Sequence, residues 1–190
     1  MLGITDEGLA HLKGIQDLNL FCRLNLTSAG FAHLAGIHTL NMEGCWQEEV
    51  GDEAFAHLKG IHTLLMGGCS QGSITPLAFS HLKGIQDINM DYCDNVRDAH
   101  LAHLKGVRSV SMMGCVGVTD AGIIHLAPSI KVLHMENCEQ PSITTKALDH
   151  LQGITELHMT GCRPALISAA RAKGLPVHVD LSRRFGMMSF

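Results

Sequence analysis

The sequence predicts an α/β solenoid, a curved right-handed βα coil with a parallel sheet on its concave face and short helices on its convex face. Three observations predict it. The pentapeptide HLKGI and its near-copies recur, with their His at positions 11, 33, 57, 81, 103, 125 and 150. A strand-like stretch such as GIHTLNMEGC follows each copy, and a segment such as ITDEGL, with a Thr or Asp at its start, precedes it. Self-similarity at a period of ~20–50 residues is the signature of a repeat architecture.

The strand of each unit is expected where buried and variable positions alternate, which is the pattern of a strand with one buried face. One aliphatic column consists of Leu18, Leu40, Leu64, Ile88, Val110, Leu133 and Leu157. The column two residues later consists of Leu20, Met42, Met66, Met90, Met112, Met135 and Met159. Six of the ten methionines are therefore expected to fill the core, where a flexible thioether adapts to irregular gaps.

A short helix is expected in the second half of each unit. Residues able to cap its N-terminus are found at Thr5-Asp6, Thr27-Ser28, Gly51-Asp52, Arg97-Asp98 and Thr119-Asp120. Pro76 suits a first helical turn, where its missing N–H costs nothing. Phe55 and Leu58 lie three residues apart and so share one helical face, which would turn toward the sheet.

The repeat follows the pattern L-x-x-L-x-L-x-x-C and resembles the leucine-rich repeat family. With Cys where many members have Asn, followed by I-T-D-x-x-L, it is similar to the cysteine-containing subclass in the recognition arcs of F-box proteins. The string ITDEGLAHLKGI is also similar to bacterial leucine-rich repeats. The resemblance implies a leucine-rich repeat solenoid that recognises proteins. One version would recruit substrates to a ubiquitin ligase, although the chain contains no F-box segment.

The positions of the repeats predict a single leucine-rich repeat domain over residues 1–190. About seven repeats would occupy residues 4–162, a helix-strand cap residues 163–182 and a tail residues 183–190. The chain starts inside a repeat unit, so we expect an uncapped N-terminal edge that is available for self-association.

Charge and motif content exclude several classes of function. The net charge is -4, with 14 Lys and Arg against 18 Asp and Glu, which argues against nucleic-acid or anionic-membrane partners. No apolar run approaches the ~20 residues of a membrane helix, and no signal peptide is recognisable. No phosphate loop, nucleophile elbow or other paired nucleophile and base is present. We therefore expect a non-enzymatic protein with no cofactor.

All seven cysteines occupy one slot of the repeat, although Cys22 comes one residue early. The others are Cys45, Cys69, Cys93, Cys115, Cys138 and Cys162. Their number is odd and no C-x-x-C is present, so a disulfide framework or zinc motif is not indicated. We expect seven free, buried thiols. Reduced thiols indicate a cytoplasmic or nuclear protein.

The variable strand positions remain as the candidate binding surface. The predicted partner-binding residues are Asp17, Asn19, Phe21, Asn41, Glu43, Leu65, Asp87, Asn89, Asp91, Ser111, Met113, His134, Glu136, Glu156 and His158. Six of them are carboxylates and none is Lys or Arg, which predicts a basic protein or peptide partner. We also expect the register to place like charges on neighbouring rungs, where they would repel one another.

One alternative concerns metal binding. His134 and His158 occupy equivalent positions in adjacent units, and Glu136 and Glu156 are nearby. Two imidazoles and two carboxylates can hold a divalent ion. An ordinary polar patch on a binding face is the competing interpretation, and it leads us to expect no metal ligands in this chain.

Overall fold

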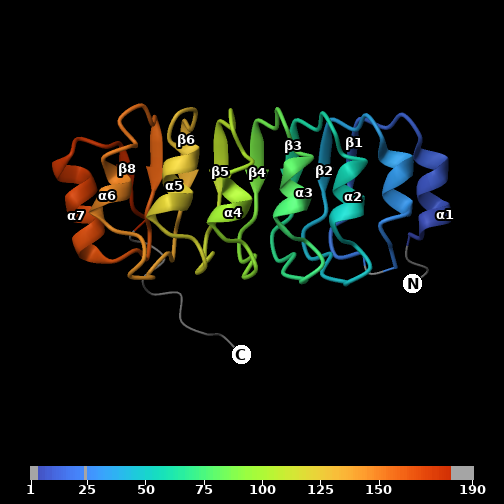
Figure 1. The fold of residues 1–190 in the computed structure, drawn as a ribbon, viewed down its shortest axis with the longest axis horizontal. Coiled ribbons are helices and arrows are strands. Elements are labelled where there is room, and N and C mark those ends of the chain that lie inside the picture. The colour runs from blue at the N-terminus through green and yellow to red at the C-terminus, as the bar shows by residue number, and fades with distance from the viewer. Residues whose placement is uncertain (1–3, 24, 181–190) are drawn as a thin grey trace.

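The computed structural model describes residues 4–23 and 25–180. Within them, eight short strands form one parallel sheet in which the strand order follows the sequence (Figure 1). The strands are β1 (Asp17–Asn19), β2 (Thr39–Asn41), β3 (Thr63–Leu65), β4 (Asp87–Asn89), β5 (Ser109–Ser111), β6 (Val132–His134), β7 (Glu156–His158) and β8 (Val177–His178). The predicted tail at 183–190 lies outside the described residues.

A helical segment follows or precedes each strand along the chain. The α-helices are α1 (Asp6–Leu9), α2 (Asp52–Ala56), α3 (Pro76–Ser80), α4 (Asp98–Leu101), α5 (Asp120–Leu126), α6 (Thr145–Leu148) and α7 (Pro164–Ala172). Two 3-10 segments, η1 (Ala10–Leu12) and η2 (Gly30–Leu34), occupy the first two units. None of the helices in the described part of the chain is long and apolar enough to cross a membrane.

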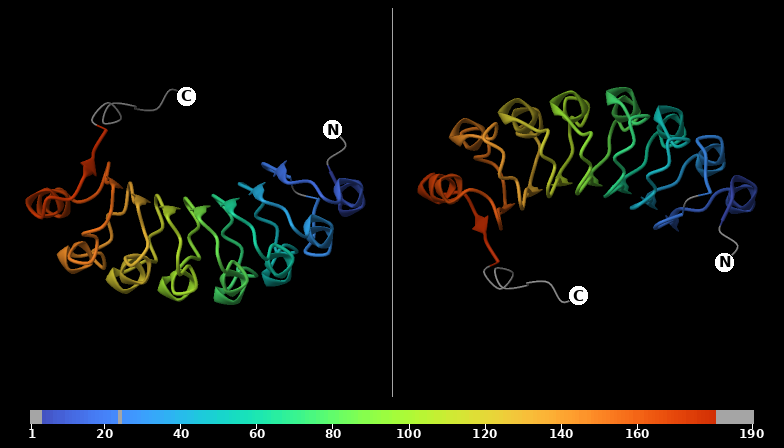
Figure 2. Two further views of the ribbon diagram at one scale, coloured as in Figure 1. Left: turned by 90° about the horizontal axis from the view of Figure 1, so that it is seen from above. Right: turned by 90° about the horizontal axis from the view of Figure 1, so that it is seen from below.

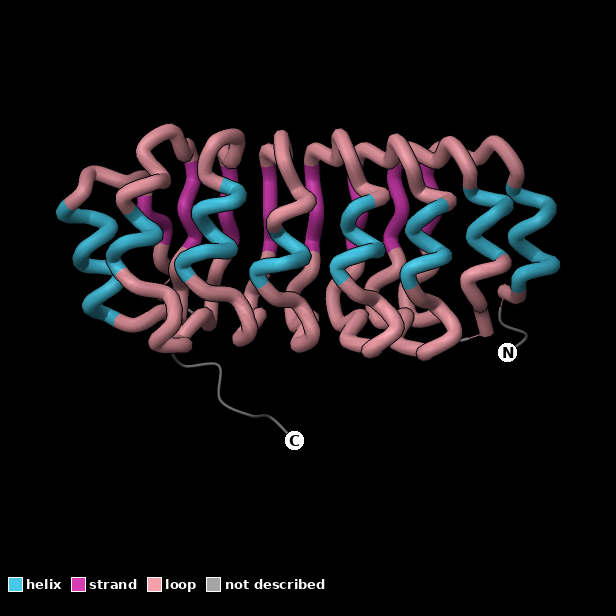
Figure 3. The backbone as a smooth tube through the Cα atoms, in the orientation of Figure 1, coloured by secondary structure: helices cyan, strands magenta, loops and turns pink. Residues whose placement is uncertain are grey.

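The molecule is an arc with the sheet on its inner side and the helices on its outer side (Figure 2). Loops join each strand to the next helix at one edge of the arc, and each helix to the next strand at the other edge (Figure 3). This arrangement confirms the predicted solenoid, with a concave parallel sheet and convex helices.

The core lies between the sheet and the helices. In the central strands the middle residue is buried and its two neighbours are not, as alternation predicts. The six core methionines are all 0% exposed; they are Met42, Met66, Met90, Met112, Met135 and Met159. On the helix side, Phe55 stacks on Phe79 with ring centroids 6.3 Å apart.

The threonine and aspartate residues at the helix starts have different roles. The threonines cap the helices. Thr5, Thr75, Thr119 and Thr144 accept a hydrogen bond from a backbone N–H of the helix that each precedes. The aspartates link repeats instead. Each accepts hydrogen bonds from the backbone N–H and the hydroxyl of the Thr one unit later, in the pairs Asp6–Thr27, Asp52–Thr75, Asp98–Thr119 and Asp120–Thr144.

Six thiols form a second ladder between units. Each Sγ donates to a backbone carbonyl of the preceding repeat, in the pairs Cys45–Leu20, Cys69–Met42, Cys93–Met66, Cys115–Met90, Cys138–Met112 and Cys162–Met135. All seven cysteines are free, but the prediction that all are buried is wrong, because Cys22 is exposed. Cys22 arrives one residue early and takes a left-handed turn with φ 54°, so its side chain leaves the ladder.

We expect one reactive thiol in the native protein, that of Cys22. Burial raises the pKa of four of the ladder thiols to about 12, namely those of Cys69, Cys93, Cys115 and Cys138. The reactive thiolate is therefore not formed by them at pH 8. Titration with a thiol reagent before and after denaturation measures the number of reactive thiols. Cys22→Ser should abolish the native signal, and a native signal from more than one thiol would contradict this assignment.

Candidate functional site

The concave surface consists of three rows of side chains that flank the buried strand positions. The first row is Asp17, Thr39, Thr63, Asp87, Ser109, Val132 and Glu156. The second row is Asn19, Asn41, Leu65, Asn89, Ser111, His134, His158 and His178. The third row is Phe21, Glu43, Gly67, Asp91, Met113, Glu136 and Thr160. Every predicted partner-binding residue lies in one of these rows and is exposed or half-buried.

The register separates the carboxylates, so the expected repulsion between neighbouring rungs is wrong. In the first row, Asp87 faces Thr63 on one side and Ser109 on the other. In the third row, Gly67 and Met113 alternate with the acids. Strands ~4.8 Å apart therefore place successive third-row carboxylates ~10 Å apart, a distance at which screening weakens their repulsion.

The amides of the second row shape the end of the strands. Oδ1 of Asn41 accepts from the backbone N–H of Glu43 at 2.9 Å, and Oδ1 of Asn89 accepts likewise from Asp91 at 2.9 Å. Each amide also donates to the carboxylate that it precedes, at 3.2 Å to Glu43 and 3.1 Å to Asp91. These asparagines therefore fix the backbone turn and the adjacent acid together.

Asp91 has the largest number of partners among the third-row acids. Besides the Asn89 amide, it accepts from the hydroxyl of Ser111 at 2.6 Å and from the backbone N–H of Met113 at 2.8 Å. Both donors belong to the next repeat. Asp91 thus links two rungs, and its removal would disturb the sheet as well as the surface charge.

Three exposed aromatic residues lie in the third row or within three residues after it in the sequence, and only Phe21 is among the predicted binding residues. The three are Phe21, Trp46 and Tyr92, which are 54%, 60% and 54% exposed. Trp46 and Tyr92 were not predicted as binding residues. They are the only Trp and the only Tyr of the chain, and each is next to a repeat cysteine. This position beside the end of a strand is the sequence feature that could have identified them as surface residues near the concave face.

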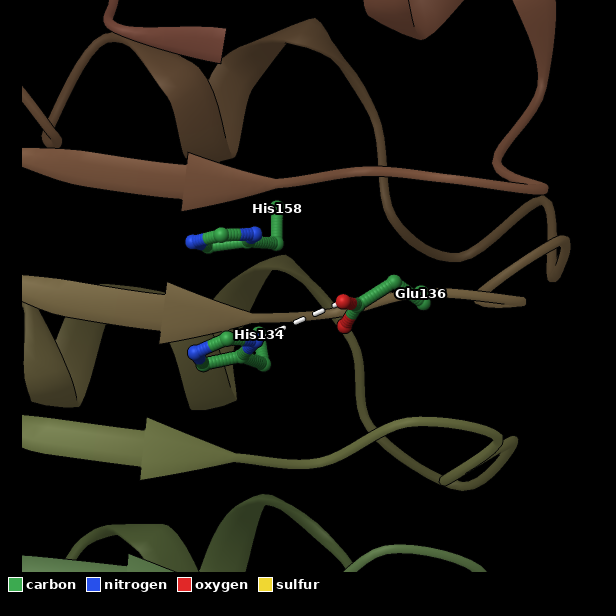
Figure 4. A group of neighbouring side chains, drawn as sticks. All are labelled: His134, Glu136 and His158. Atoms are coloured by element: carbon green, nitrogen blue, oxygen red, sulfur yellow. Dashed lines mark hydrogen bonds and ion pairs between the residues drawn. The ribbon is translucent and has the colours of Figure 1, made fainter. Parts of the chain in front are cut away.

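A histidine stack occupies the C-terminal end of the second row. The rings of His134 and His158 lie with centroids 4.0 Å apart and planes 13° apart (Figure 4). His178 continues the stack, with its ring centroid 4.8 Å from that of His158. His178 is not among the predicted binding residues, although V-H-V around β8 repeats the L-H-M pattern of β6 and β7.

Two glutamates accompany the stack, Glu136 from the loop after β6 and Glu156 from the start of β7. Nδ1 of His134 lies 3.3 Å from Oε1 of Glu136, and Nε2 of His158 lies 3.3 Å from Oε2 of Glu156. An open hollow of about 1060 Å³ lies beside the stack. Its lining includes His134, Glu136, His158 and His178, but not Glu156. A second histidine pair, His38 and His62, stacks at 4.7 Å elsewhere on the arc.

This succession of short parallel strands, convex helices and an inter-unit cysteine ladder defines a leucine-rich repeat solenoid. No protein-family model matches the sequence, and a search of curated proteins finds no match.

Two solved structures are similar to the chain. Human 5T4 (Wnt-activated inhibitory factor 1, trophoblast glycoprotein) matches with a TM-score of 0.63 and 19% identity, over 86% of this chain and 68% of that one. A chain of the Rad7 and Elc1 complex in yeast matches with a TM-score of 0.57 and 16% identity, over 95% of this chain and 45% of that one. At these identities the similarity establishes the leucine-rich repeat fold.

Proposed function

We propose that the chain is a non-enzymatic module that binds a protein or peptide on its concave face. The observation that carries this proposal is the composition of the three rows, which hold carboxylates, amides and histidines but no Lys or Arg. A continuous sheet of eight strands displays them on one curved surface, long enough for an extended peptide or a protein edge. The similar chain in the Rad7 and Elc1 complex supports a protein as the class of partner.

The concave face has acidic residues around an apolar centre, which favours a basic partner that also offers an apolar contact. Leu65, Gly67 and Met113 interrupt the acids near the middle of the arc, and interfaces often combine an apolar centre with a charged rim. The exposed rings of Trp46 and Tyr92 can stack on Lys or Arg side chains, a contact worth ~0.5–1 kcal/mol at exposed sites.

The test uses peptides that the full chain selects from a random dodecapeptide library. We expect the selected peptides to be rich in Lys and Arg, and their affinity to fall as NaCl is raised to ~0.5 M, where surface charges are screened. Asp17→Lys combined with Asp87→Lys should weaken binding about tenfold, which corresponds to ~1.4 kcal/mol. Neither carboxylate accepts a hydrogen bond from the backbone in the described contacts, whereas Asp91 does and is left intact.

The matched control reverses two charges on the convex side. Glu7→Lys with Glu53→Lys changes the net charge equally but alters only α1 and α2. Peptide affinity should then change less than twofold. Equal losses in both double variants, or selected peptides with no excess of basic residues, would refute acidic recognition on the concave face.

We also propose a cytoplasmic or nuclear location, which the free thiols support. Self-association through the edge of β1 stays a prediction. Size-exclusion chromatography with light scattering over a range of concentrations measures it.

A further inference from the structure

We propose that His134, Glu136 and His158 bind a zinc-class divalent cation at the C-terminal end of the concave face. One potential ligand atom from each of the three side chains lies within 4.8 Å of the other two. The two histidines are direct register partners on β6 and β7, and Glu136 follows β6 by two residues. The proposal is independent of the peptide-binding proposal, because it concerns the ion alone.

Two of the three ligands are already at the required separation. Zinc bonds of ~2.0–2.1 Å in a tetrahedral site place ligand atoms ~3.3 Å from one another. Nδ1 of His134 and Oε1 of Glu136 are 3.3 Å apart, and the ion would replace the imidazole proton that Nδ1 shares with this carboxylate in the metal-free chain. The ring of His158 is nearly parallel to that of His134, so it must tilt for its lone pair to converge on the same point. His158 is half-buried and borders the hollow, which gives the ring room to do so.

Glu156 prepares His158 for this role. An ionised carboxylate only accepts hydrogen bonds, so its contact with Nε2 requires the imidazole proton on that nitrogen. The lone pair is then on Nδ1. In Figure 4, one nitrogen of each ring lies on the side of Glu136. A carboxylate that fixes the tautomer of a metal-binding histidine in this way is a common second-layer contact, and we assign Glu156 as a positioning residue.

Glu136 supplies the electrostatic reason for a cation. Its Oε2 is buried and has no hydrogen-bond partner among the described residues. Burial without a partner is costly for a carboxylate oxygen. Arg171 also lines the hollow, but no ion pair joins it to Glu136 in the described contacts. A divalent ion held by both carboxylate oxygens of Glu136 and by the two imidazoles would satisfy Oε2 as well as Oε1.

The ligand types select the class of ion. Two imidazoles with one carboxylate suit Zn²⁺, Co²⁺ and related ions, whereas Mg²⁺ and Ca²⁺ prefer sets composed of oxygen atoms. Three protein ligands leave at least one coordination position open toward the hollow, where water or a side chain of a partner can bind.

The test is calorimetric titration of the full, tag-free chain with Zn²⁺. We expect one ion per chain with a Kd in the micromolar range or below. His134→Ala, His158→Ala and Glu136→Gln should each weaken binding at least tenfold, and Glu156→Gln about tenfold. Circular dichroism confirms that each variant is folded. As a second measurement on the unaltered protein, Co²⁺ should give visible bands of a nitrogen-oxygen ligand field, without a thiolate charge-transfer band.

The controls separate this site from other donors. His38→Ala disrupts the other histidine stack, and Cys22→Ser removes the exposed thiol. Neither change should alter the Zn²⁺ affinity more than twofold. Undiminished binding in the His134→Ala, His158→Ala double variant would overturn the proposal. So would loss of binding in Cys22→Ser, a thiolate band with Co²⁺, or no one-to-one binding at ~100 μM Zn²⁺.

Discussion

Replacement of Met90 by Ala is expected to lower the free energy of unfolding by ~2–5 kcal/mol, the usual cost of truncating a buried Met, Leu or Ile. Met90 is 0% exposed and lies in the core methionine column between Met66 and Met112. The cavity would open in a central unit, where repeats on both sides depend on the same packing. Urea denaturation followed by circular dichroism measures the loss.

Met113→Ala is the matched control, because it makes the same chemical change on the concave surface, two positions after Ser111. Met113 is half-buried and its sulfur contacts the hydroxyl of Tyr92 at 3.0 Å. Its truncation should cost less than ~1 kcal/mol, as is usual for surface sites. Equal losses at the two methionines would mean that the inner and outer faces of the strands are misassigned.

Asp52→Ala is expected to cost ~1.5–3 kcal/mol, the range for a hydrogen bond to a charged group. Oδ1 of Asp52 accepts from the backbone N–H groups of Thr75 at 2.7 Å and of Ala78 at 3.2 Å. Its Oδ2 accepts from the Thr75 hydroxyl at 2.6 Å. The substitution removes the acceptor of the Thr75 backbone N–H and hydroxyl at the start of α3, and it loosens the contact between two repeats.

Two further variants locate the effect. Asp94→Ala removes an exposed carboxylate that accepts no hydrogen bond in the described contacts, and it should change stability by less than ~0.5 kcal/mol. Thr75→Ala combined with Asp52→Ala forms a double-mutant cycle, in which we expect a coupling energy of ~0.5–3 kcal/mol. Additive losses, or an equal loss for Asp94→Ala, would refute the role of Asp52 as a link between repeats.

The fold could be predicted from the sequence because its determinants are local and repeated. Each unit carries its own buried aliphatic and methionine positions at period two and its own residue at the helix start, so one reading applies along most of the chain. Cys22, the one cysteine that is not buried, shows why the position within the repeat matters. Cys22 is displaced by a single residue, and a one-residue shift in a strand or turn moves a side chain to another face.

The candidate site was only partly predictable, because its properties depend on which side chains of different repeats become neighbours. The sequence located His134, His158 and their glutamates, but not the addition of His178 to the stack. It supplied the list of concave acids, but their separation came from the register, which places neutral residues opposite Asp87.

The repeat that contains Gly117 shows most clearly what only the tertiary structure decided. In other units an amide after the cysteine donates to two carbonyls of the preceding repeat, as Gln71 does to Cys45 and Val50 at 3.1 Å each. Gly117 has no side chain, and the guanidinium of Arg97 occupies the space, donating to the Val96 carbonyl at 2.8 Å. A Cβ on Gly117 would collide with that guanidinium. The sequence by itself determined the repeating frame, because each unit encodes its own strand and helix. The tertiary structure decided this substitution of one donor for another, because buried carbonyls must be satisfied by whichever side chain the packing brings within reach.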